Sequence, residues 1–353
     1  MSGNEKIIVG ISVGDLNGIG GEIILKTFAD SRMMELCTPV VFASAKLLSF
    51  YRKLLDLETP LHGVDSLEAL NPKKLNVLNV WRDRVEVNFG EEQKEAGAYA
   101  LQSLRAAVKA LKGSEIDVLV TAPINKSNIQ AETFNFPGHT DYLSEELDGE
   151  SLMLMVSDDL RVGLLTDHIP VREVSATITP QLIEKKVNLV NDALIQDFGI
   201  ERPRIAVLGI NPHIGDQGVI GSEDDQVMIP TLAAIREKGI LAYGPYAADS
   251  FFGSGNYKNF DAILASYHDQ GLIPFKTLAF GRGVNFTAGL SRVRTSPDHG
   301  TAYEIAGKNQ ADHRSFRQAV YTAIEIYRRR KQYQELSQNP LKPARRKPLG
   351  KKK

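Results

Sequence analysis

Residues 6–22, KIIVGISVGDLNGIGGE, combine two signals that together indicate the fold. Lys6–Val13 is an apolar run rich in Ile and Val, too short for a core helix, and it predicts a buried β-strand. Gly14–Glu22 follows as a glycine-rich turn that opens a helix. This turn matches neither G-x-G-x-x-G nor G-x-x-x-x-G-K-[ST], so a tight strand-to-helix connection explains it as well as a phosphate loop does.

The same alternation of strand and helix continues outward from this segment. Val40–Ala43, Leu75–Val80 and Asp117–Thr121 have the length and composition of buried strands, and Glu91–Lys112 has the spacing of an amphipathic helix. This order predicts an α/β protein with a mostly parallel sheet covered by helices. Later strands are expected at 204–210 and 261–267, and helices at 182–198, 226–238 and 312–334, with a further helix starting in SPDHGTA, 296–302.

The middle of the chain adds an antiparallel part. Ser151–Ser157 and Arg161–Asp167 are apolar runs joined by only three residues, 158–160, which predicts a hairpin. The sheet is therefore expected to be mixed.

Composition and charge exclude several classes of protein. The 353 residues suggest one to three domains, and the apolar fraction of 42% is that of a globular protein. Residues 340–353 hold seven of the 42 Lys and Arg and no acid, which leaves 35 basic against 43 acidic residues, or −8, in the body. A nucleic-acid binder built on a basic body is not expected. We expect a basic, disordered tail over 336–353.

Targeting and redox signals are equally sparse. Cys37 is the only cysteine, so neither an intrachain disulfide nor a cysteine zinc site is expected, and His, Asp and Glu would have to hold any metal. The first residues do not resemble a signal peptide, and no apolar run approaches the roughly 18–20 residues that span a bilayer. We expect a cytoplasmic protein with no membrane partner.

Three histidines stand where predicted strands end. His168, His213 and His268 each come one to three residues after an apolar run. Open α/β sheets bind ligands outside the carboxyl ends of their strands, so three such imidazoles could converge on one metal ion. The alternative is that each histidine caps a loop and contacts a backbone carbonyl. Asp167 and Asp269, directly beside two of them, could be ligands or could orient the imidazoles.

Two further segments could meet an anion. His139 and Thr140 follow Pro137-Gly138 at the start of a predicted helix, where free N–H groups favour an anion, although an ordinary capped turn is the alternative. Downstream, basic and amide side chains are concentrated within nineteen residues, where they could bind a phosphate or carboxylate or be solvated surface: Lys276, Arg282, Asn285, Arg292 and Arg294.

These segments, in this order, resemble the 4-hydroxythreonine-4-phosphate dehydrogenase family. The matching blocks span roughly residues 8–306 and are GDLNGIGGEI from Gly14, VTAPINK from Val120, FPGHTDYL from Phe136, TDHIPV from Thr166, INPHIGDQG from Ile210 with GSED from Gly221, YHDQGLIPFK from Tyr267, GRGVNFTAGL from Gly281 and RTSPDHGTA from Arg294. The family commonly has other residues at positions 16, 17, 21, 122, 288 and 291, which leaves the fine choice of substrate open.

The resemblance implies a fold and an assembly. It implies two α/β/α lobes with mixed sheets, like those of isocitrate and isopropylmalate dehydrogenases, with the active site in the cleft between them. The first lobe would be discontinuous, residues 1–140 plus 275–335, and the central lobe, 141–274, would carry metal-binding and dimer-forming elements. Family members form homodimers with the metal site completed across the two chains.

The resemblance also implies a site. One divalent ion (Zn, Mg, Co or Mn) would be held by His168, His213 and His268. Substrate contacts would come from His139, Thr140, Lys276, Asn285 and Arg294. Lys276 is also a catalytic candidate, and Asp249 is a candidate base or orienting group. No residue is assigned to the NAD or NADP that the family uses.

The implied reaction is oxidation of 4-phosphooxy-L-threonine at its C3 hydroxyl, followed by decarboxylation to 3-amino-2-oxopropyl phosphate for pyridoxal 5'-phosphate synthesis. Related substrates are the alternative: D-erythronate or D-threonate 4-phosphate, or a dihydrodiol of terephthalate. A third hypothesis is a metal-stabilised binding or scaffold protein that uses the basic tail. Kinetics on the competing phosphates and deletion of residues 340–353 would separate the three.

Overall fold

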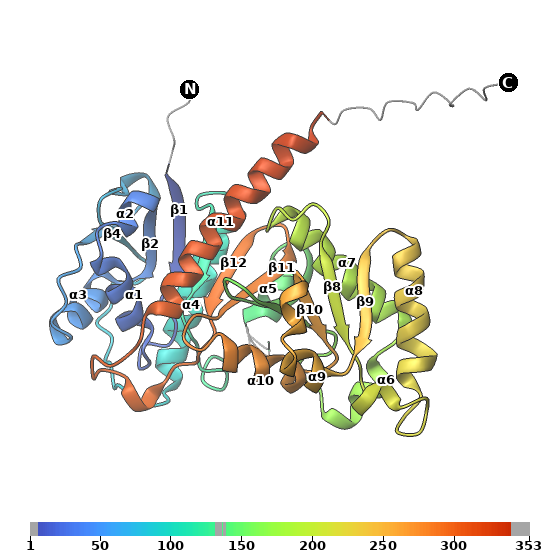
Figure 1. Ribbon diagram of the computed structural model, residues 1–353. Helices are drawn as coiled ribbons and strands as arrows, with labels where there is room; N and C mark the ends of the chain where they lie inside the picture. The colour runs from blue at the N-terminus through green and yellow to red at the C-terminus, as the bar shows by residue number, and fades with distance from the viewer. Residues whose placement is uncertain (1–5, 131–135, 137–138, 340–353) are drawn as a thin grey trace.

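The computed structural model describes residues 6–130, 136 and 139–339, and within these residues the strands form one mixed sheet (Figure 1). Twelve strands lie in the order β3-β4-β2-β1-β5-β12-β11-β6-β7-β10-β8-β9. Their bounds are β1 Ile7–Ser12, β2 Cys37–Ala43, β3 Leu61–Val64, β4 Leu75–Asn79, β5 Val118–Thr121, β6 Gly149–Val156, β7 Arg161–Leu164, β8 Arg204–Leu208, β9 Leu241–Tyr246, β10 Ala262–Ala265, β11 Val284–Leu290 and β12 Val293–Pro297.

Most neighbouring strands of this sheet are parallel. The antiparallel pairs are β6–β7, β6–β11 and β11–β12, which lie together at the centre. The expected hairpin between the runs at 151–157 and 161–167 is confirmed by β6 and β7. The sheet is thus parallel at both ends, with an antiparallel segment between them.

Helices cover both faces of the sheet. Their bounds are α1 Gly20–Ala29, α2 Met33–Leu36, α3 Ala45–Leu54, α4 Lys94–Lys112, α5 His139–Glu146, α6 Val174–Thr177, α7 Pro180–Gln196, α8 Ile229–Glu237, α9 Ala248–Gly253, α10 His268–Leu278 and α11 Arg314–Ser337. The C-terminal half of α11 projects from the body (Figure 1). No helix among the described residues is both long enough and apolar enough to cross a membrane.

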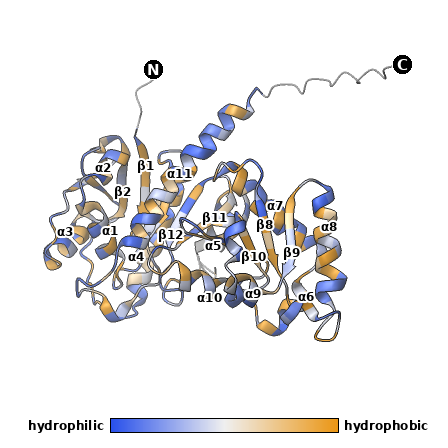
Figure 2. Ribbon diagram, viewed as in Figure 1, coloured by the Kyte–Doolittle hydropathy of each residue, from blue (hydrophilic) through white to orange (hydrophobic). Residues whose placement is uncertain are grey.

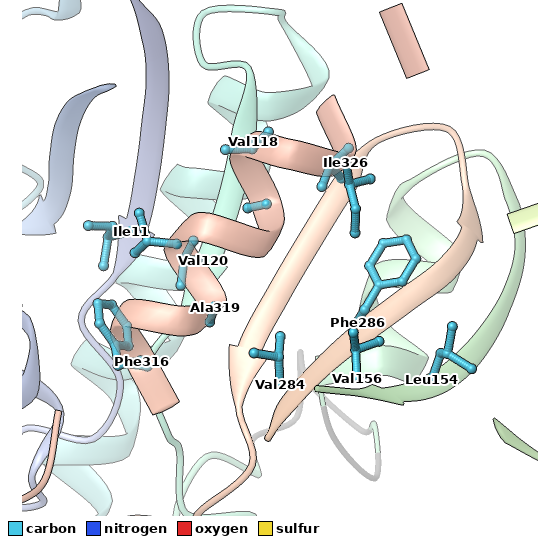
Figure 3. Packing of buried hydrophobic residues seen from close by; sticks show 14 of the residues in the cluster. Ile11, Val118, Val120, Leu154, Val156, Val284, Phe286, Phe316, Ala319 and Ile326 are labelled. Carbon is cyan, nitrogen blue, oxygen red and sulfur yellow. The ribbon is translucent and has the colours of Figure 1, made fainter. Parts of the chain in front are cut away.

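The alternation of side chains along the strands explains how two faces are buried. Val118 and Val120 of β5 belong to a core that includes Phe316 and Ala319 of α11, and Figure 3 shows these side chains together. Leu119, between them, points to the opposite face and joins a separate core with α4 and α5. Hydropathy follows this pattern, since the strands are mostly hydrophobic and the projecting end of α11 mostly hydrophilic (Figure 2).

The observed elements differ from the predicted ones at three places described here. The helix expected to start in SPDHGTA is wrong: β12 runs through Pro297, and only a 3-10 turn, Tyr303–Ile305, follows. Two strands, β11 and β12, occupy residues 284–297, for which the sequence analysis predicted basic and amide side chains but no strand. Helix α11 continues through Ser337, two residues into the tail assigned from residue 336, and residues 340–353 lie outside the described part.

The strand order bears on the expected lobes. Strands from residues 7–121 form one end of the sheet, and strands from 149–265 form the other. Between them, β12 pairs with β5 and β11 pairs with β6. The sheet runs without a break across both regions, so the division into two lobes stays a prediction.

Candidate active site

A cavity of about 340 Å³ lies where the antiparallel centre of the sheet meets β5. Loops after β5, β7 and β12 contribute to its walls, together with β11, α5 and α10. This position accords with the rule that ligands bind where strand order changes in α/β sheets. Its polar lining includes Thr121, Lys126, Thr140, Asp167, His168, Lys276, Asn285, Arg294, Ser296, Asp298 and His299.

Arg294 is the most buried charged group of this cavity. Its side chain is 2% exposed, because β12 carries it between β5 and β11. The guanidinium donates to two threonine hydroxyls: Nη2 lies 2.6 Å from Thr121 Oγ1, and Nη1 lies 3.1 Å from Thr287 Oγ1. No ion pair joins Arg294 to a carboxylate among the described residues, and burial lowers its pKa to about 9. A buried cation with only hydroxyl partners is suited to an anionic ligand.

Asn285, Lys276 and Thr140 line the same cavity. Asn285 lies on β11 opposite Ser296, and its Oδ1 is buried with no hydrogen-bond partner among the described residues. Lys276 is exposed in the last turn of α10. Thr140 lies in the first turn of α5, where its carbonyl accepts a bond of 2.8 Å from Ser144 Oγ. The side chain of His139, which begins α5, lies outside the described residues.

Two of the three strand-end histidines are neighbours. His168 follows β7 and lines the cavity, and its ring centroid lies 5.6 Å from that of His268 at the start of α10. Nδ1 of His268 lies 2.7 Å from Asp269 Oδ1. An imidazole that ligates a metal through one nitrogen usually hydrogen-bonds through the other, so this pairing suits a ligand. In that arrangement, Nε2 would be the nitrogen of His268 that ligates a metal.

His213 occupies a different local structure. It has a φ of 53° in a turn where several successive residues take left-handed backbone conformations. Asp224 holds the start of this turn by accepting bonds from the backbone amides of Ile210, at 2.8 Å, and Asn211, at 3.0 Å. In the described part of a single chain, no three His, Cys, Asp or Glu side chains form a group that could hold a metal ion. The expected convergence of three histidines is therefore not found within one chain.

The glycine-rich turn after β1 is a structural junction. Gly14 has a φ of 74°, and a Cβ there would lie 2.3 Å from the Pro123 carbonyl oxygen. Asp15, which is buried, accepts bonds from Asn128 Nδ2 at 2.7 Å and from the Tyr303 hydroxyl at 2.9 Å. The Asp15 side chain thereby joins the turn to two distant segments, which supports the tight strand-to-helix connection.

Sequence reasoning missed part of the cavity wall. His299 lines the cavity after β12, and its Nε2 is buried without a hydrogen-bond partner in the described part of the chain. The motif SPDHGTA contains this histidine, but its interpretation as the start of a helix gave His299 no role in a site. Asp249 does not line the cavity; it is exposed in α9, and its expected role stays a prediction. Of the other cationic candidates, Arg292 donates to Ser114 Oγ at 2.7 Å.

Fold and cavity together define an α/β protein with a cavity at the centre of a mixed sheet, and basic side chains line that cavity. The particular family follows from comparison: the model of the pyridoxal phosphate biosynthetic protein PdxA matches residues 35–323, and the chain belongs to this family. The family resemblance expected from the sequence motifs is confirmed.

Known relatives agree over nearly the whole chain. A 4-hydroxythreonine-4-phosphate dehydrogenase of Bacteroides thetaiotaomicron is 52% identical over 96% of this chain and 93% of its own. A putative D-threonate 4-phosphate dehydrogenase of Oceanobacillus iheyensis is 35% identical over 92% and 98%. The solved structure of the 4-hydroxythreonine-4-phosphate dehydrogenase of Klebsiella pneumoniae superposes with a TM-score of 0.79 at 33% identity, covering 93% of this chain and 99% of that one. The α/β class predicted from the sequence is confirmed.

Proposed function

We propose that this protein oxidises 4-phosphooxy-L-threonine at its C3 hydroxyl with NAD or NADP as hydride acceptor. Loss of CO2 from the resulting 2-amino-3-oxo acid then gives 3-amino-2-oxopropyl phosphate, for pyridoxal 5'-phosphate synthesis. The protein is thus an oxidoreductase that acts on a CH–OH group and decarboxylates its product.

The observation that carries this proposal is the buried guanidinium of Arg294 in a cavity that also holds Lys276. A substrate with a phosphate and a carboxylate supplies an anion for each cation. Planar guanidinium can bind such a group through two N–H donors, and the low-dielectric surroundings strengthen the attraction. Thr121 and Thr287 fix the guanidinium plane before substrate arrives, so little order has to be created on binding.

The remaining substrate groups call for acceptors. The substrate has an ammonium and a hydroxyl as donors, and the unpartnered Oδ1 of Asn285 supports a role for this side chain as an acceptor for one of them. Thr140, at the N-terminal turn of α5, adds a hydroxyl to the wall. Lys276, on the exposed side, is suited to neutralise the second anion and to attract it from solvent.

The choice between an amino acid and a sugar acid depends on more than the cations, because both kinds of substrate carry a phosphate and a carboxylate. The 52% identical relative is named for hydroxythreonine phosphate and the relative named for threonate phosphate is 35% identical, which favours the amino acid. A terephthalate dihydrodiol has no phosphate to pair with the buried guanidinium. Neither alternative is therefore proposed.

A divalent metal ion fits the donor set at the cavity. The rings of His168 and His268 are neighbours, and imidazole is a ligand that suits Zn and similar transition-metal ions. We propose that His213 completes the set from a second copy of the chain, since one chain does not bring the three together. When bound, such an ion supplies Lewis acidity that acidifies the substrate hydroxyl and stabilises the charge formed on decarboxylation.

Assembly and location form the rest of the proposal. We infer a homodimer, because exposed apolar side chains follow each metal-ligand candidate along the chain: Val171 after His168, Val219 after His213, and Ile273 after His268. A partner subunit would cover such residues. A cytoplasmic location accords with a nicotinamide-linked enzyme whose one cysteine, Cys37, is buried.

The decisive experiment compares kcat/KM for 4-phosphooxy-L-threonine and D-erythronate 4-phosphate, each with NAD and with NADP and added divalent ions. We expect the amino acid to be preferred by at least about tenfold, the equivalent of roughly 1.4 kcal/mol. Equal or higher kcat/KM on the sugar acid overturns the substrate assignment. Absence of turnover on both, with metal present, overturns the dehydrogenase itself.

A further inference from the structure

The turn that contains His213 has an unusual backbone. All six residues from His213 to Gly218 have a positive φ, and four of them are not glycine. Residues other than glycine usually enter the left-handed region singly, and a β-branched residue there, such as Ile214 with a φ of 59°, is a genuine outlier. Such a backbone persists only where the surrounding structure imposes it. The contacts that hold this turn therefore decide where the imidazole of His213 lies.

One buried carboxylate holds the point where the chain enters the turn. Asp224 is fully buried, and its oxygens accept bonds from the backbone amides of Ile210, at 2.8 Å, and Asn211, at 3.0 Å, just after β8. The side chain of Asn211 donates a third bond, of 3.0 Å, through its Nδ2. Gly209 permits this close approach, because a Cβ there would lie 2.9 Å from Asp224 Oδ1. Three N–H donors from two adjacent residues thus converge on one side chain, two residues before His213.

Asp224 is itself anchored in the core. It begins a short π-helix, Asp224–Met228, that leads directly into α8. Met228 and Leu232 are fully buried and belong to the hydrophobic core that α8 shares with β8. A π-helical turn is rare and is found frequently at functional sites. The carboxylate therefore has a fixed position, from which it can hold a strained turn.

The far end of the turn closes on itself. The Ile220 amide donates to the Gly215 carbonyl at 3.0 Å, and a Cβ on Gly215 would lie 2.3 Å from the Gly221 carbonyl oxygen. His213 is exposed at the entrance of this closed loop. Its ring can thus be reached by a second copy of the chain, while its backbone is held by the contacts of Asp224 with residues 210 and 211.

We propose that Asp224 is a positioning residue for the metal site, a role that rests on the proposed function, in which His213 is a metal ligand. The bonds from residues 210 and 211 to the carboxylate hold the left-handed turn, and the turn presents His213 to the ion. Without the carboxylate, the turn can relax to right-handed conformations. The Cα–Cβ bond of His213 then points in another direction, because the backbone sets the direction of a side chain.

The test measures the Kd for zinc of the full-length protein, by calorimetry with a competing chelator and with zinc as the sole added ligand. In Asp224→Asn the side chain keeps its size, but one of its oxygens is replaced by an N–H donor that faces other donors. We expect the Kd for zinc to rise by about 10- to 100-fold, the usual effect of losing a group that orients a metal ligand. Asp225→Asn, at the next residue, which is exposed, is the matched control and should leave the Kd unchanged.

A double variant separates positioning from a general effect on the fold. If Asp224 acts through His213, then Asp224→Asn should change the Kd by less than about threefold when His213→Ala is already present. An equal loss of affinity in both backgrounds overturns the assignment, and so does an unchanged Kd in Asp224→Asn alone. If Asp224→Asn does not fold, Asn211→Ala, which removes the Nδ2 bond, replaces it under the same criteria.

The same titrations show whether the proposed metal site itself fails. Absence of zinc binding by the wild type, or a Kd that His213→Ala leaves unchanged, overturns His213 as a ligand and the role of Asp224 with it. A Kd that rises in His213→Ala but not in Asp224→Asn overturns the role of Asp224 alone.

Discussion

The guanidinium of Arg294 combines burial with partners that carry no charge, and this has opposite consequences for function and for stability. The charged guanidinium loses its hydration when it is buried, and this desolvation costs free energy. Its partners Thr121 and Thr287 offer hydroxyl oxygens and no carboxylate, so they do not offset that cost. A bound anion would offset that cost. Free protein therefore carries an unfavourable charge that becomes useful when substrate arrives.

We predict that Arg294→Met lowers kcat/KM by at least about 100-fold, because loss of a charge-assisted contact costs roughly 3 kcal/mol. The same variant should unfold at an equal or higher temperature, since a hydrophobic side chain of similar length avoids the desolvation cost. Steady-state kinetics and calorimetry measure the two effects. Arg292→Met, two residues away and bonded to Ser114, is the control and should change both by little. A folded Arg294→Met enzyme with normal activity contradicts the assignment.

Glu223 has a pKa that links loop structure to pH. Its carboxylate accepts bonds from Ser175 Oγ at 2.6 Å and Asn211 Nδ2 at 2.9 Å, and these bonds lower its pKa to about 2 from 4.5. A folded-state pKa below the unfolded value means that the stabilisation is present above pH 4.5 and is lost as pH falls toward 2. Through these two bonds, the Glu223 carboxylate connects helix α6 to the turn that contains His213.

We predict that Glu223→Gln lowers the free energy of unfolding by about 1 kcal/mol near neutral pH, after allowance for surrounding water. The difference should shrink below pH 4.5 as the wild-type carboxyl takes up its proton. Urea titrations at several pH values measure this trend. Glu237→Gln, exposed at the end of α8 and without a side-chain hydrogen bond among the described residues, should differ little from wild type. A constant difference for Glu223→Gln at all pH values would refute the linkage.

At the scale of residues, the sequence predicted which side chains line the cavity better than it predicted the contacts between them. Strand-end position selected His168, and residue type together with the family resemblance selected Arg294 and Asn285; the structure brings all three to one cavity. The partners of Arg294 could not be predicted, because Thr121 is 173 residues away and only the sheet order joins them. His299 was missed for a related reason: an unpartnered nitrogen is a property of packing and leaves no trace in composition.

At the scale of elements, α1 and α3 pack closely at Gly21, in the first turn of α1. The ring of Tyr51, from α3, covers that position, and a Cβ on Gly21 would lie 2.2 Å from Tyr51 Cδ2. The ring is fixed, because it is 1% exposed and its hydroxyl donates to the Leu16 carbonyl at 2.5 Å.

We predict that Gly21→Ala destabilises the protein by about 1–3 kcal/mol, the usual cost of an added group in a packed core. Thermal unfolding measures the change. Gly253→Ala, at the end of α9, is the matched control, since no atom of the described residues lies within 4 Å of the added Cβ, and its effect should be neutral or slightly stabilising. If Gly21→Ala is as stable as wild type, the ring of Tyr51 is not fixed as described.

Strands that are uniform apolar runs were predictable, whereas β11 and β12, which mix apolar and polar residues, were missed. β5 and β8 are short apolar runs beside turn residues, and each was expected close to its observed bounds. β11 and β12 interrupt their apolar residues with Asn285, Thr287 and Arg294, whose side chains meet each other or the cavity. In β11 the apolar residues at 284, 286, 288 and 290 alternate with Asn285, Thr287 and Gly289, so the period-two signal of a strand is present. It was missed because the interpretation of this segment rested on its basic side chains.

At the scale of the whole molecule, the metal-ligand candidates divide into two sets. His168 and His268 are neighbours within one chain, whereas His213 joins no metal-binding group there. Exposed Val219 and Ile220 lie close after His213, on a turn that a partner subunit could cover. If two chains form the site together, then His213 and His268 of one site come from different copies, and complementation between inactive variants becomes possible.

We predict that His213→Ala and His268→Ala are each inactive as homodimers and that mixing them restores activity. After dissociation and reassociation, half of the dimers are hybrids, and each hybrid has one site with both substitutions and one intact site. The expected recovery is about a quarter of wild-type activity per chain, with one metal ion per hybrid. Mixing His213→Ala with itself is the control. If the mixture stays inactive while its mass is near twice 38.9 kDa, each metal site is built from a single chain. If the mass is that of one chain, the shared site is wrong altogether.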